Sequence, residues 1–179
     1  KGAVHLCPDV RTVIDVGGQD TKAIRTEEDG RVADFIMNDK CAAGTGRFLQ
    51  IMAHALEIDL GDMAKMEANP KIVASPINAM CTVFAESEVI GLLNRGQSRA
   101  SIVAGIYKSI ARRIASMAAR ISPVAPLALT GGLSVHSLLR EELISELQMP
   151  VFTPDHAVYA GAVGAALFAW DDSNKGGCI

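Results

Sequence analysis

The sequence predicts a layered α/β fold in which three antiparallel strands precede two strand-helix units. Short β-branched runs separated by turn residues occupy the region before residue 40. Long stretches with helical spacing follow, and two further short apolar runs each precede a helical pattern. A sheet that carries helices on its faces is the layered arrangement that buries all of these apolar surfaces.

Three strands are expected at 11–16, 21–26 and 31–37. The first, RTVIDV, is β-branched and apolar, and the other two show partial alternation of apolar and polar residues. The stretch EEDG between the second and third strands predicts a turn that closes on Gly30. The three strands are therefore expected to form a meander.

Helical spacing predicts helices over 45–56, 60–68, 83–94 and 98–120. The last of these has the strongest pattern, because its apolar residues recur every three to four positions and form one stripe. The members of this stripe are Ile102, Ile106, Ile110, Ile114 and Met117.

The remainder of the chain predicts a buried strand at 125–130, a helix at 134–147, a strand at 150–153 and a helix at 157–170. The last helix is nearly uncharged but shorter than the roughly 20 residues that a membrane-spanning helix needs, so it is expected to be a buried helix. The complete order of elements is typical of the ribonuclease-H-like layered α/β fold.

Composition limits the classes of function. The 179 residues, 49% hydrophobic, suffice for one substantial core and favour a single domain. A formal net charge of -3 gives no electrostatic reason to bind nucleic acid or an anionic membrane. The first residues show no secretory signal, so a cytoplasmic setting is expected.

Two glycine pairs follow predicted strands. Gly17 and Gly18 come after the strand that ends near Asp15, and Gly131-Gly132 connect the strand at 125–130 to the next helix. Glycines let a backbone approach a phosphate closely, successive N–H groups can bind an anion, and open α/β sheets place ligands at strand ends. These glycines are therefore expected to contact nucleotide.

Polar residues around the first glycine pair add to this interpretation. Asp15, Gln19 and Asp20 are expected to order a water on Mg²⁺, with Asp15 and Gln19 as the catalytic candidates. The alternative is that each glycine pair is only a tight exit from a strand. Neither a P-loop motif nor a GxGxxG sequence after the first strand is present.

The chain has four cysteines, and two of them precede helical patterns. Cys41 stands three residues ahead of Gly-Thr-Gly at the start of one helical run, and Cys81 stands directly before another. The positive end of a helix lowers the pKa of a thiol, but the spacing alone favours the alternative that both are ordinary buried cysteines. Cys7 and Cys178 have no such setting and are expected to be incidental.

Other titratable residues have simpler expected roles. The histidines do not cluster in sequence, so no histidine-based metal site is expected, and each is interpreted as a surface or cap residue. Glu86 and Glu88 are expected to support a helix start, with a nucleotide contact as the lesser alternative. The basic residues of 98–120 predict a solvated face, with docking to an acidic partner as the alternative. They are Arg99, Lys108, Arg112, Arg113 and Arg120.

Six stretches together resemble the BadF/BadG/BcrA/BcrD ATPase family, which contains the activator ATPases of 2-hydroxyacyl-CoA dehydratases and the ATP-binding subunits of benzoyl-CoA reductase. They are VIDVGGQDTK, NDKCAAGTGRFL, MCTVFAESEVIGLL, ASIVAGIYKSIARRI, LALTGGLSVHS and YAGAVGAALFA. The resemblance covers about residues 11 to 170, and CAAGTGRF and CTVFAESEV are its most specific parts. It implies one half of an ATPase of the actin, Hsp70 and sugar-kinase type.

The resemblance also implies a function. Family members are homodimers in which two cysteines of each protomer, here Cys41 and Cys81, hold one 4Fe-4S cluster at the interface. ATP or ADP binds with Mg²⁺, and ATP hydrolysis drives a low-potential electron into a 2-hydroxyacyl-CoA dehydratase or an aryl-CoA reductase component. Reduced ferredoxin or flavodoxin is the implied electron donor. A nucleotide-binding regulatory or kinase-like domain without a cluster remains the alternative.

One motif of the family is missing. Members open with a glycine-rich turn of the form G-x-D-x-G-S-T-x-x-K, which forms the other wall of the phosphate site, and nothing in this sequence matches it. The chain is therefore interpreted as a C-terminal half. Residues 1–10 are the expected crossover from a missing half, 11–170 the half-domain and 171–179 a disordered tail. This half alone is expected to be inactive as an ATPase.

Overall fold

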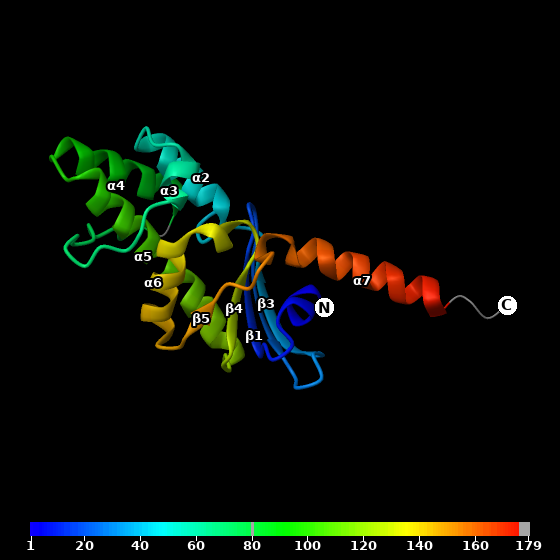
Figure 1. Cartoon of the computed structure of the whole chain (residues 1–179). Helices are drawn as coiled ribbons and strands as arrows, with labels where there is room; N and C mark the ends of the chain where they lie inside the picture. The colour runs from blue at the N-terminus through cyan, green and yellow to red at the C-terminus, as the bar shows by residue number, and fades with distance from the viewer. Residues whose placement is uncertain (80, 176–179) are drawn as a thin grey trace.

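A five-stranded sheet in the order β3-β2-β1-β4-β5 lies at the centre of the molecule. The computed structural model describes residues 1–79 and 81–175. The strands are β1 (Thr12–Val16), β2 (Thr21–Thr26), β3 (Val32–Asn38), β4 (Leu127–Thr130) and β5 (Val151–Phe152). The first three pair antiparallel, whereas β4 and β5 run parallel to β1, which confirms the predicted ribonuclease-H-like order (Figure 1).

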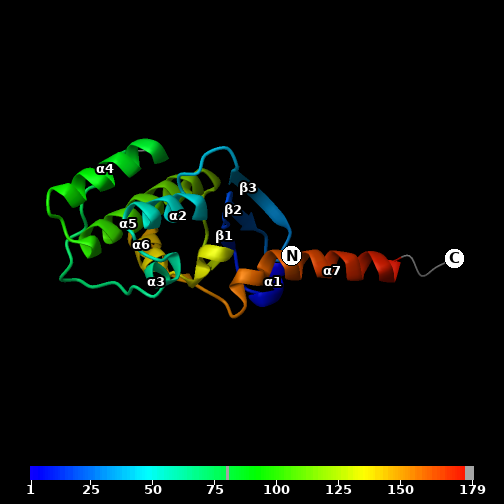
Figure 2. The same cartoon turned by 90° about the horizontal axis from the view of Figure 1, so that it is seen from above.

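The helices surround this sheet (Figures 1 and 2). They are α1 (Gly2–Leu6), α2 (Gly46–Ala55), α3 (Leu60–Ala64), α4 (Thr82–Asn94), α5 (Arg99–Ala118), α6 (Ser137–Leu147) and α7 (Ala160–Lys175), with single 3-10 turns at Ala119–Ile121, Gly132–Val135 and Ala157–Tyr159. Helices α5 and α6 cover one face of the sheet, and α1 lies against the other with the first turns of α7 packed on α1 (Figure 1). Helices α2, α3 and α4 form a helical lobe at one end of α5, and their buried residues belong to the same core as the sheet and α5.

The predicted apolar stripe forms the centre of the larger core. Ile102, Ile106, Ile110 and Ile114 of α5 are each at most 1% exposed, and they pack with Ile14 of β1. The hydroxyl of Ser98 caps this helix by accepting a 3.1 Å hydrogen bond from the backbone of residue 101. The periodicity of the sequence therefore identified both the longest helix and its buried face.

Helix α3 is shorter than its pattern predicts, because it ends at Ala64 rather than at residue 68. Pro70 disfavours helical geometry at Asn69, whose side-chain oxygen accepts a 3.0 Å hydrogen bond from the backbone N–H of Lys71. Residues 66–69 lie instead in an irregular segment that leads to this turn.

The prediction of a buried helix at the end of the chain is wrong. Helix α7 continues to Lys175 and extends away from the rest of the molecule, with Phe168 59% and Trp170 69% exposed (Figure 2). Only its first turns are packed, where Gly164 approaches the backbone of Gly2 so closely that an added Cβ would lie 2.9 Å from the Gly2 nitrogen.

The predicted tail at 171–179 is also helical as far as residue 175, and 176–179, including Cys178, lie outside the described residues. Lys1 forms an ion pair with Asp171, and its ammonium lies 4.5 Å from the centre of the Phe168 ring. Over the described part of the chain, no helix is both long and apolar enough to span a membrane.

Candidate nucleotide turns and cysteine segments

The first glycine pair lies in a four-residue turn between β1 and β2, whose register pairs Val16 with Thr21. The N–H of Gly17 donates a 2.9 Å hydrogen bond to the carbonyl of Asp20, which closes the turn. A Cβ at Gly17 would lie 2.7 Å from Oδ1 of Asp20, so the turn has no room for a side chain there. We call residues 17–20 the phosphate turn.

The second glycine pair lies against the end of β1. Gly131 has a φ of +85°, and a Cβ there would lie 2.6 Å from the carbonyl oxygen of Val16. By contrast, no heavy atom lies within 4 Å of a Cβ added at Gly18 or at Gly132. The structure therefore brings the two predicted glycine turns together at one end of the sheet and leaves open space beside each.

A polar group lies next to these turns. The parallel register of β1 and β4 places Asp15 opposite Thr130, whose hydroxyl donates a 2.7 Å hydrogen bond to the Asp15 carboxylate. Lys22 bonds to the Asp20 carboxylate at 2.6 Å, and its ammonium lies 3.9 Å from Oδ1 of Asp15. Two carboxylates and one ammonium thus share the site, and the amide of Gln19 is exposed at its edge.

Sequence reasoning did not predict the contact that joins the phosphate turn to the helical lobe. The N–H of Gly46 donates a 2.9 Å hydrogen bond to the carbonyl of Gly17, and the N–H of Arg47 donates a 2.7 Å hydrogen bond to the carbonyl of Gly18. These are N–H groups of the first turn of α2, which have no partner within a helix. The phosphate turn therefore holds the start of α2.

Cys41 lies in the loop before α2, and its expected position at a helix terminus is wrong. The helix begins at Gly46 with Thr45 as its N-cap, and its first N–H groups bond to the phosphate turn. Asn38 instead shapes the loop: its amide donates to the carbonyls of Cys41 and Ala43 at 2.9 and 3.2 Å. Cys41 is half-buried as a result of this packing.

Cys81 has the expected setting, since it is the N-cap residue of α4 and is exposed. Glu88 holds the segment before it. The Glu88 carboxylate accepts 3.0 Å hydrogen bonds from the backbone N–H groups of Asn78 and Ala79. Its observed role is therefore to position the extended approach to Cys81, in addition to being part of the helix that it was expected to support.

The described residues offer only a small set of metal donors. No three His, Cys, Asp or Glu side chains within 1–79 and 81–175 lie close enough to hold a metal ion together. Helices α2 and α4, which follow the two cysteines, pack against one another.

Comparison with known proteins identifies the group to which this fold and these turns belong. The model of the BadF/BadG/BcrA/BcrD ATPase family matches residues 1–169. The chain belongs to the BadF/BadG/BcrA/BcrD ATPase family. The resemblance seen in the six sequence stretches is thereby confirmed over almost the whole chain.

Two curated relatives in this ATPase family are named as activators. The chain is 40% identical to the 2-hydroxyisocaproyl-CoA dehydratase activator of Clostridioides difficile over 98% of its length and 65% of the activator. It is 46% identical to the (R)-2-hydroxyglutaryl-CoA dehydratase activating ATPase of Acidaminococcus fermentans, over 97% of its length and 66% of that protein. The chain thus spans slightly less than two thirds of these relatives.

Solved structures agree with the family assignment. The activator of the 2-hydroxyisocaproyl-CoA dehydratase, solved with bound ADPNP, superposes with a TM-score of 0.88 over 97% of this chain and 65% of the activator chain, at 40% identity. MreB5 of Spiroplasma citri, at 12% identity and a TM-score of 0.54 over 97% of this chain and 57% of its own, shows the shared actin-like fold alone.

Proposed function

We propose that this chain is the part of an ATP-driven activator that couples a nucleotide site to a bridging 4Fe-4S cluster. The observation that carries the proposal is the pair of hydrogen bonds from Gly46 and Arg47 to the carbonyls of Gly17 and Gly18. These two bonds join the phosphate turn to α2, the helix that directly follows the Cys41 loop.

The nucleotide end of this arrangement is built from the two glycine turns. The open space beside Gly18 and Gly132 leaves their backbones accessible to a phosphate or a ribose. Asp15, Gln19 and Asp20 would hold the water shell of Mg²⁺ and orient the attacking water, with Asp15 fixed by Thr130. The solved activator relative with bound ADPNP supports a nucleotide in this fold.

The two cysteine segments would supply two of the four thiolates that a cubane cluster needs. Cys81 presents an exposed thiol at the N-terminus of α4, where the positive end of the helix dipole suits an anionic cluster, and Cys41 presents a second thiol from a loop shaped by Asn38. A 4Fe-4S cluster takes four thiolates and supplies one-electron transfer when bound. Two protomers related by a twofold axis would complete the set.

Backbone hydrogen bonds would couple the nucleotide site to the Cys41 loop. A change in the phosphate turn on ATP hydrolysis would move the first turn of α2, because a direct hydrogen bond cannot stretch far without being lost. The Cys41 loop ends at Thr45, the N-cap of the same helix. Movement of α2 relative to α4 would therefore change the spacing of Cys41 and Cys81.

The relatives suggest the partner. Activators of 2-hydroxyacyl-CoA dehydratases are 40% and 46% identical to this chain, so a dehydratase of this type is the proposed electron acceptor, with reduced ferredoxin or flavodoxin as the donor. A benzoyl-CoA-reductase-like role is the second candidate, because one component of the benzoyl-CoA reductase of Thauera aromatica is 38% identical over 94% of this chain and 61% of its own length.

Anaerobic reconstitution with iron and sulfide tests the proposal. We expect about two irons per chain and a particle with the mass of a dimer, since four irons serve two chains. Addition of Mg²⁺ with ADP or ATP should then alter the electron paramagnetic resonance spectrum of the reduced cluster. A monomer that binds a full cluster by itself, or a chain that binds no iron, would contradict the proposed site.

A further inference from the structure

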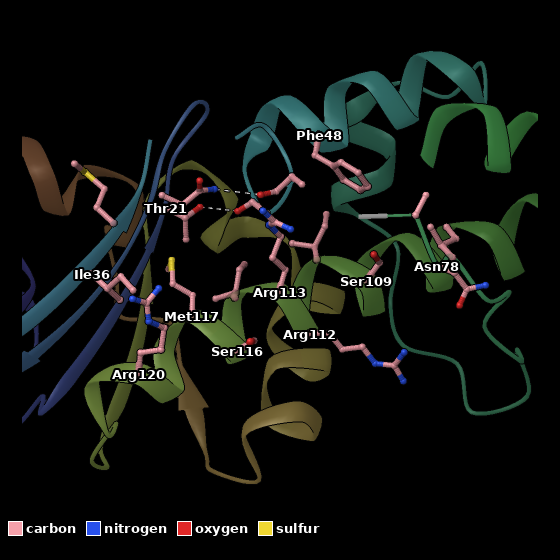
Figure 3. Close-up of a pocket in the computed structure, with 18 residues that line it drawn as sticks. Thr21, Ile36, Phe48, Asn78, Ser109, Arg112, Arg113, Ser116, Met117 and Arg120 are labelled. Carbon is pink, nitrogen blue, oxygen red and sulfur yellow. Dashed lines mark hydrogen bonds between the residues drawn. The ribbon is translucent and has the colours of Figure 1, made fainter. Parts of the chain in front are cut away.

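A cavity of about 580 Å³ lies apart from the glycine turns. It is enclosed by the ends of β2 and β3, the second half of α5, the loop at 43–44 and the segment at 77–79 (Figure 3). Its volume falls in the range of about 300–1,000 Å³ that small-molecule sites usually occupy. Neither Cys41 nor Cys81 lines it, although residues on both sides of Cys41 do.

The lining carries positive charge that is only partly compensated. Three arginines line the cavity, and none of its other lining residues is Asp or Glu, in a chain whose net charge is -3. Arg112 bonds to Glu146 at 3.1 Å. Over residues 1–79 and 81–175, Arg113 and Arg120 have neither an ion pair nor a side-chain hydrogen bond. Two guanidinium groups are thus left for a ligand.

The partial burial of Arg113 indicates that its guanidinium group needs a bound partner. Arg113 is half-buried, and its side chain lies along the loop beside Gly44, where an added Cβ would be 3.3 Å from Cδ of the arginine (Figure 3). Taking a charge out of water is costly unless an opposite charge or several hydrogen bonds replace the lost water. A bound anion would provide that replacement.

Helix α5 and the turn after it arrange the polar groups in one row. Ser109, Arg113, Ser116 and Arg120 recur every three to four residues and line the same cavity. At 1.5 Å per residue the row extends about 16 Å. The two serine hydroxyls belong to the same row as the arginines and can donate further hydrogen bonds to an anionic group.

The floor of the cavity is apolar. Phe48, Ile110 and Ile114 line it but are each at most 2% exposed. The apolar surface that a ligand could cover is that of Ile36, Met37 and Met117 near β3 (Figure 3). Covering this apolar surface is favourable only when the ligand places apolar atoms against it, because both surfaces are then removed from water. A ligand that suits both parts must combine a hydrophobic body with an acidic group.

We propose that this cavity binds a small organic anion with an apolar body, whose acidic group pairs with Arg113 and Arg120. The glycine-turn residues and the two cysteines do not line the cavity, although Asn38, Asn78 and Ala79, which belong to the cysteine segments, do. Small carboxylates, sulfonates and phosphate esters share the required chemistry.

Anilinonaphthalene sulfonate, whose fluorescence rises on binding, is a suitable probe, and uncharged phenylnaphthylamine is its matched control. The double substitution Arg113→Gln and Arg120→Gln should weaken sulfonate binding by at least about tenfold, because both charge-assisted hydrogen bonds to the sulfonate are lost. Binding of the uncharged probe should change little. Arg95→Gln, an arginine outside the cavity, should leave both affinities unchanged.

A blocking variant identifies the place of binding. Ser109→Trp directs a large side chain into the cavity from α5 and should abolish binding of both probes, with circular dichroism confirming the fold. Decanoate should displace the sulfonate probe, whereas decanol should not.

Equal sulfonate affinity in the parent and in the double arginine variant would overturn the proposal. Probe release as chain concentration rises would also overturn it, because a second copy would then cover the cavity.

Discussion

The backbone N–H of Arg47 donates a 2.7 Å hydrogen bond to the carbonyl oxygen of Gly18. With the neighbouring bond from Gly46 to Gly17, it joins a turn at the end of β1 to a helix of the helical lobe. A backbone link of this kind has no rotamers, so movement at one end is transmitted to the other.

Gly46→Ala should loosen the junction. Its Cβ would lie 3.0 Å from Cα of Gly18, 3.2 Å from the Gly17 carbonyl and 2.9 Å from a methyl of Leu133. Two of these neighbours are backbone atoms, so relief requires a backbone shift, at a cost of about 1–3 kcal/mol in the free energy of unfolding. Urea denaturation measures the loss. Gly161→Ala, where no atom lies within 4 Å, is the control and should not destabilise the chain.

Gly132→Val should remove nucleotide binding while leaving the fold intact. No atom lies within 4 Å of its Cβ position, so the branched side chain occupies only the space through which a nucleotide would approach. Isothermal titration with Mg²⁺ and ADP should show an affinity at least about tenfold weaker, equivalent to about 1.4 kcal/mol or more. Unchanged ADP affinity would remove this turn from the nucleotide site.

The chain described here should bind ADP weakly and hydrolyse ATP negligibly, because no sequence in it matches the glycine-rich turn expected to form the other wall of the phosphate site. A longer protein that contains both walls should do both. A coupled assay of phosphate release measures turnover. Rapid ATP hydrolysis by residues 1–179 alone would show that the second wall is unnecessary.

Cys41→Ala and Cys81→Ala should each abolish iron binding. Under the proposed twofold arrangement, one substitution removes two of the four thiolates, so each single variant should lose nearly all of the iron rather than half. Iron and sulfide analysis after anaerobic reconstitution measures the result. Cys7→Ala is the control and should leave iron binding unchanged, since Cys7 packs against a small apolar cluster of Val10, Val13 and Ala128.

Stability should fall as the pH drops below about 6.5, and His136 should cause part of the loss. His136 is 4% exposed, its Nδ1 lies 2.6 Å from the hydroxyl of Tyr107, and burial lowers its pKa from 6.5. Below pH 6.5 the imidazole of the unfolded chain takes up a proton, whereas that of the folded chain does not. The free energy of unfolding therefore falls with pH until the folded pKa is also passed, below which this group lowers it no further.

Urea midpoints at pH 7.5 and 5.5 measure this dependence. His136→Gln should reduce the difference between the two midpoints, whereas His54→Gln, at an exposed position, should not. An equal difference in the parent and in the His136 variant would show that other groups determine the acid sensitivity. The burial of His136 was not predicted, because a single histidine before a helix gives no sign of what packs over it.

Local patterns identified most of the elements and several of the site residues. Isoleucines at three- to four-residue spacing marked the buried face of α5, glycine pairs marked both turns at the end of the sheet, and Cys81 was correctly placed before α4. Each of these features depends on residues close together in the chain. The roles of Gly17, Gly18, Gly131 and Gly132 in nucleotide contact stay predictions.

The sequence by itself thus determined the order of strands and helices along the chain, the family and the residues of the two glycine turns. Only the tertiary structure decided that α2 bonds to the phosphate turn, that Glu88 holds the approach to Cys81 and that Arg113 has no partner among the described residues around its cavity. It also left most of α7 exposed. Periodicity reports which face of an element is apolar, whereas partners far apart in sequence are set by how the folded elements pack.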